Sequence, residues 1–185
     1  MKFVLENVET ARLQFRKINN ADFNQWLGFF KDPSSFEHWT GEFDKPEIEC
    51  KKWFKRQAER YENDEGGMNA LIEKNEGKLI GYAGLLVQVV DGLPELEVAY
   101  SLLPDFRNKG LASEAAIKCR DYAFENDFAD SLISIVSLSN APSAHVAVKN
   151  GMHIEKQTVY KENQVNIFRI FKTDWQKNQN AIGFG

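Results

Sequence analysis

The sequence has 185 residues, of which 43% are hydrophobic, which is enough for one domain with a sizeable core and too few for two comfortable ones. Its net charge of −4 argues against a general nucleic-acid binder, which needs an electropositive surface. No stretch approaches the roughly 18 apolar residues of a membrane helix, and no N-terminal apolar signal segment stands out. We therefore expect a single domain over residues 1–185, cytoplasmic, with no nucleic-acid or membrane partner.

The first half of the chain is predicted to form a strand, two helices and three further strands. Strands are predicted from alternating or continuous apolar runs, and helices from apolar residues at helical spacing. Gly77 and Gly92 lie between the later strands, where a residue that accepts positive φ suits a hairpin turn. The expected elements are a strand at 12–18, helices between residues 20 and 33 and from 46 to 61, and strands at 69–74, 78–90 and 95–103.

The second half alternates helices and strands. The expected elements are a helix from about residue 108, a strand at 132–138, a short helix between 140 and 151, and strands at 153–160 and 165–171. The order strand–helix–strand between residues 95 and 138 implies a parallel crossover inside an otherwise antiparallel sheet. Cys50 and Cys119 fall among core positions of helices, so we expect reduced, buried thiols.

The turn "PDFRNKGLASEAA", residues 104–116, joins a strand to a small-residue helix. Neither a Walker A loop nor a dinucleotide-binding glycine pattern is present in it. A helix that starts here nevertheless brings unpaired backbone N–H groups to one point, where the helix dipole favours an anion. Gly110 has no side chain to obstruct a ligand, and Arg107 and Lys109 add positive charge. From the residues alone, the turn is either an anion-binding site or a basic helix cap.

The segment from Arg107 to Ala112 matches the Q/R-x-x-G-x-G/A signature of the GNAT N-acetyltransferases. The surrounding "LEVAYSLLPDFRNKGLASEA" resembles the fourth strand and third helix of that family. "SLSNAPSAHVAVKNGM" resembles its later N-x-x-S…K-x-G-F segment, with Met152 in place of Phe, and "ETARLQF" resembles the opening strand of the RimJ/RimL-type branch. The resemblance covers about residues 9–171 and implies acetyl transfer to protein N-termini or small amines.

The resemblance also implies a fold. It is α/β (α+β), the GNAT fold, with a mixed, mostly antiparallel sheet of about seven strands, about four helices and a parallel pair at strands 4 and 5. Acetyl-CoA is the implied co-substrate, and no metal is expected, because the histidines and cysteines lack metal-ligand spacing.

The family resemblance assigns the turn to the pyrophosphate of coenzyme A and the backbone around residues 100–102 to its pantetheine arm. The N–H near Leu102 is then a candidate oxyanion donor. Asn140 either contacts the pantetheine or caps its helix. The candidate cofactor-binding residues are Tyr100, Ser101, Leu102, Arg107, Asn108, Lys109, Gly110, Leu111, Ala112, Ser113 and Asn140.

The resemblance makes Glu97 and Ser143 candidate catalytic residues and Glu95 a candidate substrate-binding residue. Glu97 occupies a position where GNAT enzymes often carry an acidic base, and Glu95, two residues earlier on the same strand face, would extend that route or attract a cationic substrate. Alternatively, both carboxylates are ordinary solvent-facing strand residues. The tyrosine that many members carry seven residues after the Asn is Ala147 here, whereas Ser143 matches the serine of the RimL-type branch. Ser143 either donates a hydrogen bond to the leaving thiolate or is an ordinary first-turn helix residue.

The acceptor is the least defined part of the expected reaction. His38 and Trp39 lie between the first two helices, where GNAT folds often line the acceptor pocket, although a loop-packing role fits them equally. The expected function is direct transfer of acetyl from acetyl-CoA to a primary amine of a small molecule or protein N-terminus. The alternative is a catalytically inactive acyl-CoA-binding sensor or interaction protein of the same fold. Amino acids, polyamines, aminoglycosides and protein N-termini all fit an acidic pocket wall, and exposed strand edges permit a homodimer.

Overall fold

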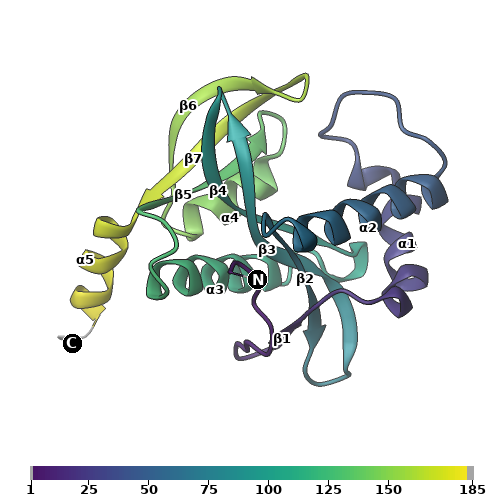
Figure 1. Cartoon of the computed structure of the whole chain (residues 1–185), viewed down its shortest axis with the longest axis horizontal. Helices are drawn as coiled ribbons and strands as arrows, with labels where there is room; N and C mark the ends of the chain where they lie inside the picture. The colour runs from purple at the N-terminus through teal and green to yellow at the C-terminus, as the bar shows by residue number, and fades with distance from the viewer. Residues whose placement is uncertain (1, 183–185) are drawn as a thin grey trace.

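A computed structural model describes residues 2–182, which form one seven-stranded mixed sheet flanked by helices (Figure 1). Three short 3-10 helices, η1 (Asn20–Asp22), η2 (Pro33–Ser35) and η3 (Pro104–Phe106), lie in the connections. The main elements are β1 (Leu13–Arg16), α1 (Phe23–Lys31), α2 (Pro46–Glu62), β2 (Gly66–Glu73), β3 (Lys78–Val90), β4 (Leu93–Leu102), α3 (Leu111–Glu125), β5 (Ser131–Ser137), α4 (Ala141–Lys149), β6 (His153–Tyr160), β7 (Asn163–Phe171) and α5 (Lys172–Ile182).

The strands are arranged in the order β1-β2-β3-β4-β5-β7-β6. β4 and β5 are parallel, and all other neighbouring strands are antiparallel. The predicted hairpin connections at Gly77 and Gly92 and the predicted parallel crossover are therefore confirmed. The two turn glycines adopt positive φ, 66° at Gly77 and 80° at Gly92, as the hairpin prediction required.

About four helices were expected, and the described residues contain five α-helices. The additional helix, α5, follows β7 directly and has a polar sequence, KTDWQKNQNAI, with no repeating apolar stripe. Trp175 attaches it to α3: its ring lies 5.5 Å from that of Phe124, and its indole N–H donates to Asp121 at 2.8 Å. One aromatic contact gives no periodic signal, so the sequence pattern misses the helix.

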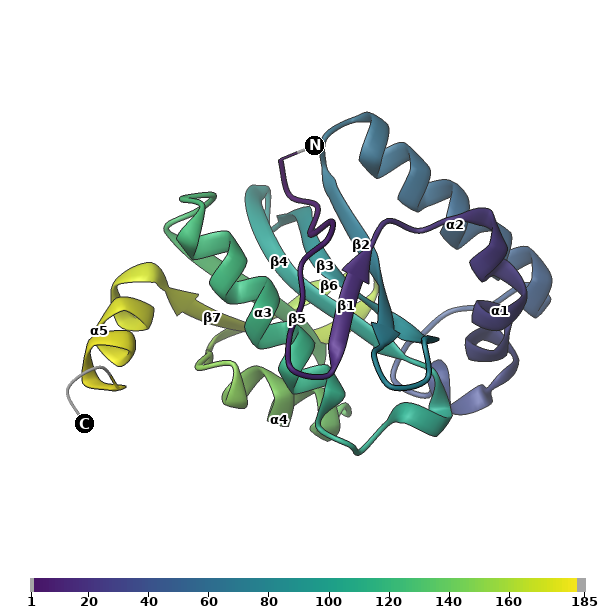
Figure 2. The same ribbon diagram turned by 90° about the horizontal axis from the view of Figure 1, so that it is seen from below.

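Helices cover both faces of the sheet, with α1 and α2 on one side and α3 and α4 on the other (Figure 2). Successive residues of a strand point to opposite faces. On β4, Val98 and Leu102 join the core beneath α3, whereas Ala99 packs against the aromatic core beneath α1 and α2. β4 therefore presents its odd-numbered residues to one face and its even-numbered residues to the other. The cysteine prediction is confirmed, since both thiols are free and buried.

Candidate active site

β4 and β5 separate after a single point of pairing. The one register position formed between them among the described residues joins Glu97 to Ile133. One residue later, the Val98 carbonyl accepts a hydrogen bond from the Ser134 hydroxyl at 2.9 Å, so it still points toward β5. We call the region beyond this point the β4–β5 divergence.

Backbone groups of β4 point into this divergence. Backbone groups alternate between the two neighbours of a strand, so those of Tyr100 and Leu102 point toward β5, as those of Val98 do. The bond from Leu103 N–H to the Ile80 carbonyl on β3, at 2.9 Å, agrees with this alternation. The Leu102 N–H, which the family resemblance makes a candidate oxyanion donor, therefore faces the β4–β5 divergence.

The N-terminus of α3 has no side-chain cap. Its N-cap residue, Gly110, adopts φ 75° and ψ 1°, a left-handed conformation that favours glycine. The N–H groups of Leu111, Ala112 and Ser113 have no acceptor within the described chain. A Cβ on Gly110 would meet only the Arg12 guanidinium, at 3.5 Å, so the space in front of the turn is open. This donor set fits a phosphate group.

Glu97 is buried on the face of β4 that α1 and α2 cover, with 8% of its surface exposed. One carboxyl oxygen accepts a hydrogen bond from the Gln88 side-chain amide at 2.7 Å. Burial raises the pKa of Glu97 above its usual range, although Gln88, the Ile135 backbone and the nearby cations oppose the shift. A carboxyl group with a raised pKa is suited to act as a base near neutral pH.

Gln88 connects Glu97 to two other elements. Its amide oxygen accepts hydrogen bonds from Arg60 of α2 at 3.1 Å and from the Tyr160 hydroxyl of β6 at 2.9 Å. These two donors fix the orientation of the amide, so its NH2 group must face Glu97. Gln88, Arg60 and Tyr160 do not stand out in the sequence, since only the tertiary fold brings β3, α2 and β6 together at this point.

Ser143 lies on the opposite side of β4 from Glu97, in the first turn of α4. The Asn140 side chain accepts the Ser143 N–H at 3.0 Å, which confirms Asn140 as the helix cap. The Ser143 hydroxyl shares a hydrogen bond of 2.9 Å with the Tyr100 hydroxyl, which also donates to the Ser143 carbonyl at 3.0 Å. Burial raises the pKa of Tyr100 to about 12. Tyr100, singled out in the sequence for its backbone, thus places a phenol beside Ser143, whereas Ala147 is buried and carries no such group.

Comparison with known proteins identifies the family. A family model described as an acetyltransferase (GNAT) domain matches residues 12–153. This chain belongs to the GNAT acetyltransferase family. It is an acetyltransferase, and the family uses acetyl-CoA, in agreement with the phosphate-binding geometry of the α3 N-terminus.

Individual relatives agree with this assignment. The uncharacterized protein YkkB of Bacillus subtilis (strain 168) is 28% identical over 159 residues, which cover 84% of this chain and 89% of YkkB. The crystal structure of an acetyltransferase from Agrobacterium tumefaciens str. C58 matches with a TM-score of 0.76 and 26% identity, over 92% of this chain and 96% of that one. RimL, a ribosomal L7/L12 alpha-N-protein acetyltransferase in complex with coenzyme A, matches with a TM-score of 0.70 over 89% of this chain and 97% of its own. At 13% identity, the RimL likeness concerns the fold alone.

The Arg107 side chain of this acetyltransferase is directed away from the α3 N-terminus. Its guanidinium donates to Asp32 at 3.0 Å, to Ser34 and Ser35 at 2.7 Å each, and to the Leu102 carbonyl at 3.1 Å. These partners lie in and beside η2 and at the end of β4. The side chain therefore holds the turn to the α1 side of the molecule.

We expect Arg107→Lys to lower the free energy of unfolding by about 1–3 kcal/mol, because one ammonium group cannot replace the several bonds of a guanidinium fork. Urea denaturation measures this change. Coenzyme A affinity, measured where the variant is folded, should fall less than it does when Gly110 is substituted. Unchanged stability with a large loss of affinity would instead place the Arg107 side chain on the ligand.

Glu95 points to the same face as Glu97 but is engaged within the sheet. Both of its carboxyl oxygens accept hydrogen bonds from Arg169 of β7, at 2.6 and 2.9 Å. The side chain of Glu95 is only 15% exposed and that of Arg169 only 11%. Arg169 also pairs with Glu155 at 2.9 Å. The charge of Glu95 is thereby compensated by its own neighbours.

The loop between α1 and α2 reaches across to the hairpin of β6 and β7 (Figure 1). Within it, His38 Nδ1 lies 3.0 Å from the Ser139 hydroxyl, and the Thr40 N–H donates to the Asn163 side chain at 3.0 Å. Trp39 is 43% exposed. His38 thus attaches the loop to the connection between β5 and α4, while Trp39 remains available on the surface.

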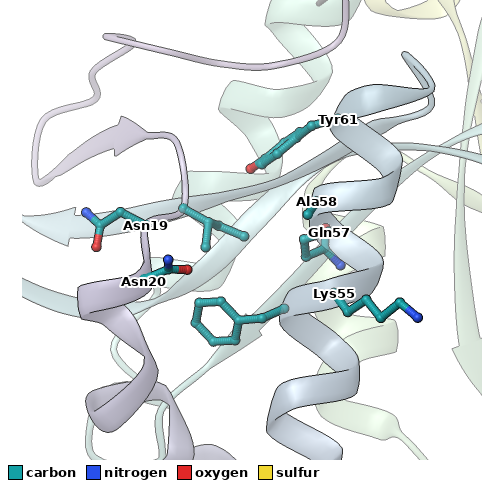
Figure 3. A pocket seen from close by; sticks show the side chains of 8 residues that line it. Asn19, Asn20, Lys55, Gln57, Ala58 and Tyr61 are labelled. Atoms are coloured by element: carbon teal, nitrogen blue, oxygen red, sulfur yellow. The ribbon is translucent and has the colours of Figure 1, made fainter.

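A separate surface hollow of about 250 Å³ lies between α2 and residues 18–20 (Figure 3). Lys55, Gln57 and Tyr61 line it, together with Asn19 and other neighbours. Among the described residues that line it there is no carboxylate, histidine or cysteine, so it offers no acid–base pair.

Residues 2–182 lack two further features, a metal-ligand cluster and a membrane-spanning helix. No group of three or more His, Cys, Asp or Glu side chains there is arranged to hold a metal ion. None of the helices in that range is both long and apolar enough to cross a membrane.

Proposed function

We propose that this acetyltransferase, as a single domain of the RimJ/RimL type, transfers the acetyl group of acetyl-CoA to a primary amine by direct attack. The acceptor is a small molecule or a protein N-terminus. The observation that carries the proposal is the placement of Glu97 on one face of β4 and of the Ser143–Tyr100 pair on the other, at the β4–β5 divergence. A proton acceptor and hydroxyl donors thus lie on the two sides of one opening.

The donor end of the site is formed by backbone groups. Acetyl-CoA, when bound, supplies an activated acetyl group and a thiolate leaving group. The N–H groups of residues 111–113 and the open surface at Gly110 would hold its phosphates. Backbone of β4 facing the divergence would pair with its extended arm, as an added strand does. The Leu102 N–H would stabilise negative charge on the reacting carbonyl oxygen.

Glu97 would remove a proton from the acceptor. An α-amine has a pKa of about 8 and a lysine amine about 10.4, so a neutral nucleophile requires deprotonation at physiological pH. Gln88 and the Ile135 backbone each hydrogen-bond the Glu97 carboxyl group, and its remaining acceptor positions would serve the amine or an intervening water. Because burial raises the pKa of Glu97, the carboxylate is a better base than an exposed glutamate.

Ser143 would assist departure of the thiolate. A serine hydroxyl is a poor acid, but it can donate a hydrogen bond to sulfur. With its pKa at about 12, Tyr100 stays protonated. When its single hydrogen turns from the Ser143 carbonyl to Ser143 Oγ, the serine hydrogen can turn toward the leaving group. This arrangement supplies the hydroxyl function that is missing at Ala147, and it favours an active enzyme over a binding protein.

We expect Ser143→Ala and Tyr100→Phe each to lower kcat by about tenfold, which is less than the roughly 100-fold minimum for a proton-transfer group because the serine only donates a hydrogen bond to sulfur. The double variant should lose little beyond the worse single variant, because the two hydroxyls act as one unit. Thiol release from acetyl-CoA in the presence of an amine measures all three rates. Rates equal to wild type, or losses that multiply in the double variant, would contradict the paired role.

A further inference from the structure

The surroundings of Glu97 are basic. Arg60 and Tyr160 both donate to the Gln88 amide that binds Glu97, at 3.1 and 2.9 Å. Lys161 extends over the Tyr160 ring, with its Nζ 5.1 Å from the ring centroid. Arg60 is therefore joined to Glu97 through the Gln88 amide, and Lys161 lies over the ring of the tyrosine whose hydroxyl binds the same amide.

A third cation belongs to the same group. Arg56 lies one helical turn before Arg60 on α2, so the two side chains share a face of the helix. Lost hydration, and then repulsion from Arg56 and Arg60, lowers the pKa of Lys161. We call Arg56, Arg60 and Lys161 the cationic wall.

No carboxylate neutralises the cationic wall. None of its three members forms an ion pair with any acidic side chain in the described part of the chain. On the same helix, by contrast, Lys52 pairs with Asp44 at 2.6 Å and Lys55 approaches Glu59 at 3.7 Å. Glu95, the acidic residue expected to attract a cation, is neutralised by Arg169. With three cations near the single carboxylate of Glu97, the wall therefore keeps a net positive charge beside the candidate base.

We infer that the acceptor carries an anionic group, a carboxylate or a phosphate, close to its primary amine, and that the cationic wall binds this group while Glu97 faces the amine. The inference rests on the proposed function. It replaces the acidic pocket wall expected from the sequence. Guanidinium and ammonium groups suit carboxylates and phosphates. The same charges repel a polyamine, whose second ammonium would approach the wall.

Two matched acceptor sets distinguish a small-molecule source of this chemistry from a peptide source. The small-molecule set is β-alanine, O-phosphoethanolamine, n-propylamine and 1,3-diaminopropane. The peptide set has the N-terminal sequences Ala-Glu, Ala-Gln and Ala-Lys on a common neutral peptide. In at least one set, kcat/KM for the anionic acceptors should be at least about tenfold above that for the neutral acceptor, a ratio that corresponds to about 1.4 kcal/mol. The cationic acceptor should have the lowest kcat/KM of its set.

Substitutions in the cationic wall test whether it causes the preference for anionic acceptors. In the double variant Arg56→Gln/Lys161→Gln, the ratio of kcat/KM for anionic over neutral acceptors should fall at least about fivefold, since two of three favourable charges are removed. Because the acceptors are compared at one pH, any change that the variant causes in the ionisation of Glu97 affects each kcat/KM equally and cancels in the ratio. Lys55→Gln is the control for the Arg56 change: it removes one positive charge from the same helix, but Lys55 lines the separate hollow between α2 and residues 18–20 (Figure 3). Its ratio should equal that of wild type.

Failure of this inference and failure of the proposed function give different results. Acetylation of amines with equal or lower kcat/KM for the anionic acceptors in both sets overturns this inference alone. An anionic preference that persists undiminished in the folded double variant also overturns it. Thiol release with none of the acceptors overturns the proposed function and this inference with it. If the double variant does not fold, the comparison of anionic, neutral and cationic acceptors with the wild-type enzyme still tests the inference.

Discussion

Gly110→Asn is expected to weaken coenzyme A binding at least about tenfold, or 1.4 kcal/mol, in a protein that remains folded. The residue adopts φ 75° at the uncapped start of α3, and only the Arg12 side chain lies near the position of a Cβ. Asparagine enters this left-handed region more readily than other residues. Asn108 does so two residues earlier, with φ 60°. The backbone should therefore tolerate the change, while the new side chain occupies the space in which phosphate binds.

Gly77→Asn provides a matched control for this variant. Gly77 adopts φ 66° in the turn between β2 and β3, and no atom lies within 4 Å of its Cβ position. Any small destabilisation from asparagine at positive φ should be similar in the two variants, and thermal melting measures it. Calorimetry with coenzyme A should show loss of affinity at Gly110 alone. Wild-type affinity in folded Gly110→Asn would remove the turn from the binding site.

Glu97→Gln is expected to lower kcat/KM at neutral pH by about 100-fold, within the usual range for the loss of a general base. Glutamine preserves shape and an acceptor oxygen for Gln88, so the local structure should persist. Since burial disfavours the charged form of Glu97, the neutral variant should be at least as stable as wild type. Steady-state thiol release and thermal melting measure the two effects. An unchanged rate would show that Glu97 is not the base.

The raised pKa of Glu97 also predicts a pH dependence. The wild-type rate should fall as the pH drops through this raised pKa, which lies above the ordinary value of 4.5. Between the ordinary and the raised pKa, the folded protein binds more protons at Glu97 than the unfolded chain does. The contribution of Glu97 to stability therefore decreases as the pH rises through that window. In Glu97→Gln, both the acid limb of the rate profile and this contribution should be absent.

The elements of the fold and the position of the uncapped turn before α3 could be predicted because their signals are local. Alternation along a strand places Glu95 and Glu97 on one face, and Asn140 caps α4 from three residues before Ser143. Gly110 adopts the positive φ that the turn requires. Helix α5 could not be predicted, since one packed tryptophan leaves no periodic pattern.

The partners of the candidate catalytic residues depend on tertiary register. Gln88 lies nine residues from Glu97 along a hairpin, but Arg60 and Tyr160 reach it from α2 and β6. Tyr100 meets Ser143 across 43 residues of sequence. No local pattern encodes such contacts. The two glutamates alone therefore predicted an acidic acceptor region, whereas the contacts around Gln88 lead us to propose a basic one.

The central claim is that this chain moves an acetyl group from acetyl-CoA to a primary amine. Intact-mass measurement of peptide and small-molecule amines, incubated with acetyl-CoA and the enzyme, tests it most directly when free thiol is followed in the same reaction. We predict acceptors heavier by one acetyl group, with one thiol released for each, and a strong reduction of both signals in Glu97→Gln. Binding of acetyl-CoA without acetylation of any amine or release of thiol would contradict the claim.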